Sequence, residues 1–227
     1  MQMTMRWFGP QEDKIPLEYI RQVPGVEGVV GALYDVAPGE IWPVEKIKAL
    51  VEQAHAAGLT MEVIESVNIH DDIKIGTPER DRYIENYKQT IRNLAGFGVK
   101  VICYNFMPVF DWMKTDMNYR LPDGSLTMAF EKQGIDKTLE EVVKEVLDNS
   151  NGFALPGWEP ERLAKVQELF ARYNGVDDDK LRENLFYFLR EIIPVCEEVG
   201  VKMAIHPDDP PYSIFGLPRV VKNRDDL

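Results

Sequence analysis

The polar residues best suited to metal binding or catalysis lie in the run Ala204–Pro211, where an apolar segment ends in a histidine. His206 is followed within three residues by Asp208 and Asp209, and Pro207 stiffens the chain between them. Imidazole suits Mn, Fe or Zn, and carboxylates suit harder cations, so this run predicts a divalent metal site. The alternative is a capping histidine beside a solvated acidic turn, and the residues alone leave both interpretations open.

A second polar group, Glu65–Asp72, follows another apolar run. Glu65 could bind or polarise a substrate hydroxyl, and His70 could transfer a proton near neutral pH. The alternative is a loop whose acidic residues face water.

Two smaller candidates occupy similar positions. Arg6 could clamp a carboxylate with its planar guanidinium, with Trp7 as an apolar wall, or it could pair with a neighbouring helix. Asn105 offers a hydrogen-bonding amide after a further apolar run. His55 lies inside a helical pattern, and we interpret it as a surface residue.

Familiar nucleotide and hydrolase motifs are absent from the sequence. It has no GxGxxG after a strand, no phosphate-loop signature, no GxSxG and no CxxC. These absences weigh against nucleotide-dependent enzymes and serine hydrolases.

Five apolar runs are predicted strands, and helical patterns separate most of them. The runs are Met3–Phe8, Val26–Tyr34, Thr60–Val67, Lys100–Phe106 and Lys202–His206. They are apolar rather than alternating, which is typical of a parallel sheet covered on both faces. The repeated unit of helix, glycine and strand predicts an α/β fold, either a (β/α)₈ barrel or a doubly wound sheet.

The intervening helices carry recognisable boundary signals. Pro43 opens one helix and Gly58 ends it, while Thr77 is the expected N-cap of the next. A third helix runs from about Leu181 to Val199, and Pro194 should bend or break it.

A long insertion, at about residues 107–179, follows the fourth strand. Its first part, Met107–Gly134, contains Pro122-Asp123-Gly124 and is expected to form loop and hairpin. Helical patterns follow around Leu139–Leu147 and Leu163–Tyr173. The insertion is either a cover over an active site or a decoration of the fold.

All five candidate residues, Arg6, Glu65, His70, Asn105 and His206, fall at or just after the carboxyl end of a predicted strand. In a parallel barrel such residues converge on one mouth whatever their sequence separation. Their convergence predicts an enzyme that uses a metal to act on a small polar molecule.

Composition excludes several classes of partner. The 26 basic and 38 acidic residues give a net charge of −12, which argues against nucleic acid or an anionic membrane. No apolar run is long enough to span a bilayer, and the N-terminus lacks a secretion signal, so a cytoplasmic protein is expected. Cys103 and Cys196 are expected to be buried, reduced thiols.

Several stretches resemble mannonate dehydratase: Met5–Gly9, Leu17–Gln22, Pro78–Lys88, Val101–Trp112 and Ala204–Pro211. The resemblance implies a (β/α)₈ TIM barrel that uses Mn²⁺ or Fe²⁺ to convert D-mannonate into 2-keto-3-deoxy-D-gluconate in hexuronate catabolism. It makes His206 a metal ligand and places the family's other ligands, a Cys, a His and an Asp, on later strands. The chain is then a single barrel domain, residues 1–227, truncated after about five β/α units.

The expected site therefore has His206 at the metal and a set of residues at the sugar acid. That substrate-binding set is Arg6, Trp7, Glu65, His70, Asn105 and Asp208. Two alternatives stay open: a sugar isomerase or epimerase of the xylose-isomerase type, and an inactive fragment. Unpaired edges of an incomplete barrel would favour a homo-oligomer.

Overall fold

The computed structural model describes residues 2–132, 141, 144, 148 and 166–227. Two compact units are present. The first unit comprises Met1–Phe106 and Gly175–Pro207, and the second unit comprises Met107–Asn174 and Asp208–Leu227. The single-domain assignment of residues 1–227 stays a prediction.

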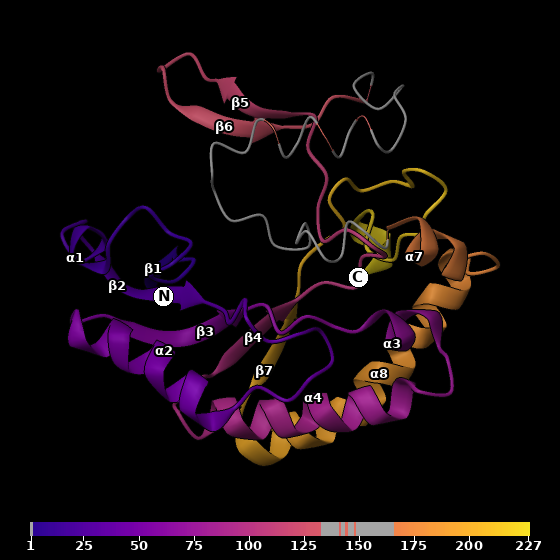
Figure 1. The fold of residues 1–227 in the computed structure, drawn as a ribbon, viewed down its shortest axis with the longest axis horizontal. Coiled ribbons are helices and arrows are strands. Elements are labelled where there is room, and N and C mark those ends of the chain that lie inside the picture. The colour runs from indigo at the N-terminus through magenta and orange to yellow at the C-terminus, as the bar shows by residue number, and fades with distance from the viewer. Residues whose placement is uncertain (1, 133–140, 142–143, 145–147, 149–165) are drawn as a thin grey trace. The chain divides into compact units, whose positions relative to one another are not determined.

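The first unit contains a five-stranded parallel sheet (Figure 1) in the order β1-β2-β3-β4-β7. Its strands are β1 Met3–Arg6, β2 Val26–Gly31, β3 Thr60–Glu65, β4 Val101–Tyr104 and β7 Lys202–Ile205. The five predicted strands and their sequential parallel order are confirmed. A doubly wound sheet, whose strand order reverses near its centre, is excluded for these strands.

Helices follow the strands as the repeated sequence unit predicts. They are α1 Leu17–Ile20, α2 Val44–Ala56, α3 Asp71–Ile75, α4 Arg80–Ala95 and α8 Asp178–Val199. Helices α2, α4 and α8 lie on the same side of the sheet (Figure 1), and α4 packs against α8. Phe188 of α8 centres this core, because its ring meets those of Tyr87, Tyr104 and Phe106 at centroid distances of 5.1, 6.3 and 6.1 Å.

Glycines end the helices that lead into strands, as expected. Gly58 after α2 and Gly200 after α8 have φ angles of 75° and 73°. A side chain is strained in this left-handed region, so glycine stops the helix and turns the chain toward the next strand.

Two sequence predictions about these elements are wrong, and a third is contradicted in part. Thr77 is not the N-cap of α4, because the helix begins after Glu79 and the buried Thr77 hydroxyl has no hydrogen-bond partner among the described residues. Pro194 does not break α8, which continues through it from Asp178 to Val199, and a bend at Pro194 stays a prediction. The sheet is not evenly buried on both faces, since β4 alternates half-buried and buried residues and β7 alternates exposed and half-buried ones.

The second unit begins with the predicted hairpin. Strands β5 Asp116–Arg120 and β6 Leu126–Ala129 pair antiparallel, and Leu121 and Ser125 close the turn with a 2.9 Å backbone hydrogen bond. Helix α7 spans Val166–Arg172 and agrees with the later of the two helical patterns. The pattern at residues 139–147 lies almost wholly outside the described residues.

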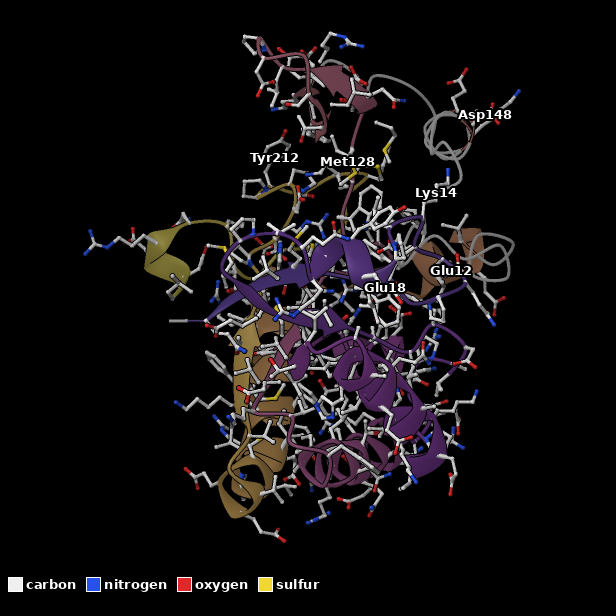
Figure 2. All side chains as sticks on the ribbon, turned by 90° about the vertical axis from the view of Figure 1, so that its left-hand side faces the viewer. Glu12, Lys14, Glu18, Met128, Asp148 and Tyr212 are labelled. Atoms are coloured by element: carbon white, nitrogen blue, oxygen red, sulfur yellow. The ribbon has the colours of Figure 1, made fainter. Side chains whose placement is uncertain are left out.

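Aromatic contacts link other parts of the second unit. The ring of Phe170 on α7 lies 6.1 Å from Phe110 and 6.3 Å from Phe215. Tyr212, labelled with Met128 of β6 in Figure 2, meets Phe130 edge-on at 5.7 Å. A short 3₁₀ helix, η2 Arg224–Asp226, ends the chain. No helix in the described ranges is both long and apolar enough to cross a membrane.

Candidate functional site

The register of the sheet brings the carboxyl ends of its strands to one edge. Glu65 pairs with Cys103 across β3 and β4, and Cys103 pairs with Ala204 across β4 and β7. Partnered residues in a parallel sheet share a face, and residues two apart on a strand share it too. Glu65, Cys103, Asn105 and His206 therefore line the same face at the same edge, while Ile64 and Ile102 are buried on the other.

Arg6, at the end of β1, is held by three contacts. Its Nη2 donates to the Tyr34 hydroxyl at 2.7 Å, and its Nη1 donates to the Val30 carbonyl at 3.4 Å. The Phe8 ring lies 4.9 Å from the guanidinium carbon and stacks on Tyr34. The cation is therefore fixed at the edge where the strands end.

Glu65 and Cys103 form a contact between adjacent strands. The Cys103 thiol donates to Glu65 Oε1 at 3.8 Å. Burial raises the pKa of the Cys103 thiol to about 11, the Glu65 carboxylate adds to the increase, and the Arg6 cation opposes it. The thiol is thus protonated at neutral pH and is a hydrogen-bond donor rather than a nucleophile.

Tyr34 belongs to the same group of charges. Burial raises the pKa of Tyr34 to about 12, with Arg6 opposing the increase and Glu65 adding to it. Arg6, Tyr34, Glu65 and Cys103 therefore lie within electrostatic range of one another. We call these four side chains the Arg6 cluster.

His70 has a structural role in the described geometry. Its Nδ1 accepts a 3.1 Å hydrogen bond from the backbone N–H of Asp72 and so caps α3. Its ring stacks on Tyr83 with centroids 3.7 Å apart and an angle of 15° between the rings. Both contacts fix the imidazole, and its use as a proton carrier stays a prediction.

His206 extends the β4–β7 ladder, since its N–H donates to the Tyr104 carbonyl at 2.7 Å. Its side chain is exposed, and Nδ1 lies 2.6 Å from the Pro207 carbonyl. A carbonyl only accepts, so this contact places a proton on Nδ1, and in the neutral ring Nε2 then presents a lone pair. A ring that donates from Nδ1 to a carbonyl leaves Nε2 available to a metal.

Two predicted site residues are buried instead. Asp208 is 4% exposed, and its carboxylate accepts hydrogen bonds from the N–H groups of Val220 and Val221, both at 2.7 Å, inside the second unit. Asp208 is therefore an internal anchor rather than part of a solvated turn. Trp7 is 3% exposed, so it belongs to the core and offers almost no surface as an open wall of a site.

The remaining sequence predictions gave mixed outcomes. His55 is an exposed residue of α2, as expected, and Cys196 is buried, but Cys103 is only half-buried. Sequence reasoning missed Tyr34 and the position of Cys103 in the site. Cys103 could have been found from its place two residues before Asn105, whereas Tyr34 lies beyond the end of β2 and carried no such signal.

The fold and these residues define an α/β protein with a parallel sheet and a polar site at the carboxyl ends of its strands. A sequence profile of the D-mannonate dehydratase family matches residues 1–227. The chain is 65% identical over 227 residues to a mannonate dehydratase of Lactococcus lactis subsp. cremoris and 60% identical over 228 residues to one of Thermotoga petrophila. A crystal structure of mannonate dehydratase from Streptococcus suis serotype 2 superposes with a TM-score of 0.84 at 43% identity.

The chain therefore belongs to the D-mannonate dehydratase family. The matches cover all of this chain but 63% of the Lactococcus and Thermotoga proteins and 59% of the Streptococcus chain. The chain thus spans about three-fifths of the length of these relatives.

Proposed function

We propose that this chain forms part of a hydro-lyase that converts D-mannonate into 2-keto-3-deoxy-D-gluconate and water in hexuronate catabolism. The observation that carries the proposal is the family match over all 227 residues. The five sequential parallel strands are proposed to be strands of a (β/α)₈ barrel, because sequential parallel strands separated by helices are the arrangement of such a barrel.

The substrate is a polyol with one carboxylate, and the strand-end residues suit both features. The guanidinium of Arg6 matches a carboxylate in charge and geometry. Glu65 accepts hydrogen bonds from sugar hydroxyls, and the Asn105 amide both donates and accepts. We assign these three residues to substrate binding.

We also propose His206 as a ligand of Mn²⁺ or Fe²⁺. The exposed imidazole with its proton on Nδ1 suits that role, but the described parts of the chain contain no group of three or more His, Cys, Asp or Glu that could hold a metal. The described residues thus supply one donor and not a complete site, since stable sites take three or four protein ligands. When bound, the metal would supply positive charge beside the reacting carbons.

The reaction sets two demands on protein groups. A base must remove the C2 proton beside the carboxylate, and an acid must protonate the C3 hydroxyl as it leaves. We assign neither role to a residue of this chain. Arg6 contributes before either step, because it neutralises the substrate carboxylate and fixes the C2 atom relative to the strand ends.

A chimera tests the proposed function. In it, this chain replaces the matched segment of the Lactococcus lactis relative, to which it is 65% identical. We expect Mn²⁺-dependent formation of a 2-keto acid from D-mannonate. Isomerisation of a neutral aldose without dehydration of D-mannonate would instead favour the xylose-isomerase type, and no activity on either substrate would contradict both.

A further inference from the structure

The side chain of Arg6 is held more firmly than a surface arginine. The Tyr34 hydroxyl and the Val30 carbonyl accept from different guanidinium nitrogens, and the Phe8 ring lies against the guanidinium carbon. An arginine side chain is long and has many rotamers, so ordering it when a ligand binds costs conformational entropy. Contacts that remove this freedom before binding make the cation a better anion receptor.

Tyr34 makes the shortest of these contacts. Its oxygen accepts from Arg6 Nη2 at 2.7 Å, so its own O–H points away from Arg6 as a donor. Burial raises the pKa of Tyr34 to about 12, so the phenol stays neutral and cannot compete with a substrate anion for the cation. The Phe8 ring stacks on Tyr34 with centroids 6.2 Å apart, which fixes the phenol in turn.

We propose that Tyr34 is a positioning residue that holds the Arg6 guanidinium ready for the carboxylate of a sugar acid. This inference rests on the proposed function, because it takes Arg6 as the carboxylate receptor. Tyr34 acts through Arg6, and the dyad selects an acidic sugar over a neutral polyol of the same size.

The first experiment measures ligand binding without a metal. D-mannonate and D-mannitol are titrated into the purified 227-residue chain in a chelating buffer and followed by NMR. Wild type is expected to bind D-mannonate in preference to D-mannitol, and Tyr34→Phe to bind D-mannonate about 3- to 10-fold more weakly, the cost of ordering one long side chain. Arg6→Met should lose the preference, and the double variant should bind no more weakly than Arg6→Met.

The second measurement reports on Arg6 without any ligand. The Arg6 Nε–Hε resonance should be sharp and slow to exchange in wild type and should broaden in Tyr34→Phe. Phe8→Leu, which removes the ring on the guanidinium but keeps the hydroxyl, should broaden it too. Tyr19→Phe is the matched control, because the Tyr19 side chain is exposed on α1, and it should change neither binding nor the resonance.

The outcomes separate the inference from the proposed function. A wild-type chain that binds D-mannonate, with Tyr34→Phe unchanged in affinity and in the Arg6 resonance, overturns the positioning role alone. A double variant clearly weaker than Arg6→Met also overturns it, because Tyr34 would then act independently of Arg6. A wild-type chain without preference for D-mannonate overturns Arg6 as the carboxylate receptor, and the role of Tyr34 falls with it.

Discussion

At the scale of single residues, the Asp208 carboxylate stabilises backbone rather than presenting a charge to solvent. Its Oδ2 accepts from two consecutive N–H groups, those of Val220 and Val221, and its backbone N–H donates to the Val221 carbonyl at 2.9 Å. This buried carboxylate accepts from two backbone amides, so it links the start of the segment Asp208–Leu227 to residues near its end.

Asp208→Ala should therefore destabilise the second unit by about 2–4 kcal/mol, because two buried amides lose a charged acceptor. Urea denaturation followed by circular dichroism measures the change. Asp179→Ala, which removes an exposed carboxylate from the first turn of α8, is the matched control and should cost under about 1 kcal/mol. Equal costs for the two variants would contradict the anchoring role.

The two thiols give a pH dependence of stability. Burial raises the pKa of Cys103 and of Cys196 from 9.0 to about 11 each. Between these values the unfolded chain has lost the thiol protons while the folded chain keeps them, so stability falls as pH rises from about 9 to 11. Urea midpoints at pH 8, 9 and 10 should show this fall, and Cys196→Ala should flatten it. A midpoint constant from pH 8 to 10 would contradict the shift.

At the scale of elements, the two packed helices α4 and α8 differ in how their N-termini are capped. Asp177 caps α8 by accepting from the Lys180 N–H at 2.8 Å, whereas α4 begins after Glu79 without a side-chain cap. The Thr77 hydroxyl, which the sequence pattern predicts as a cap, is buried and makes no hydrogen bond to any residue that the structure describes.

Asp177→Ala should cost about 1 kcal/mol of unfolding free energy, the usual value of an N-cap. Thr77→Val should be neutral or stabilising, because it replaces an unsatisfied buried hydroxyl with a methyl group of the same shape. Thermal melts of both variants beside wild type test the pair. A larger loss for Thr77→Val than for Asp177→Ala would show that Thr77 has a partner in solution.

The elements also show which features a sequence pattern can predict. Strand existence and order were predictable, because the apolar runs and the Gly58 and Gly200 boundaries are local signals. The ends of the strands were not. Each strand ends before its apolar run does, because a strand extends only as far as its backbone pairs with a neighbouring strand.

The site was predictable only in part for a related physical reason. The shared edge of Glu65, Asn105 and His206 follows from parallel strands. By contrast, the burial of Asp208 and Trp7 and the pairing of Arg6 with Tyr34 depend on tertiary contacts. No spacing rule connects Arg6 to a residue that lies 28 positions further along the chain.

At the scale of the whole molecule, the described sheet ends in two strands, β1 and β7, each paired on one side only. Met3 and Met5 of β1 are 61% and 37% exposed. An unpaired strand with apolar side chains favours association with another chain.

We therefore expect the 227-residue chain to associate as its concentration rises, with sedimentation velocity as the measurement. Met3→Lys should weaken the association, because a charge on an edge strand opposes pairing. Leu227→Lys, which changes an exposed apolar residue outside the sheet, is the control. A chain that stays monomeric throughout would contradict the expected homo-oligomer.

Belonging to the family does not by itself give this chain a complete metal site. Among the residues that the structure describes, no three metal-binding side chains gather, and His206 is the one strand-end imidazole of the sheet. One imidazole holds Mn²⁺ loosely, because a stable site needs three or four protein ligands. The 227-residue chain should thus bind Mn²⁺ at least about 10-fold more weakly than the chimera with the Lactococcus relative.

In the chimera, His206→Ala should remove both Mn²⁺ binding and dehydration, while His55→Ala, on the exposed face of α2, should change neither. Calorimetry with Mn²⁺ measures binding without reference to turnover. Equal Mn²⁺ affinity in the chain and the chimera, or full affinity after His206→Ala, would show that the ligands lie elsewhere.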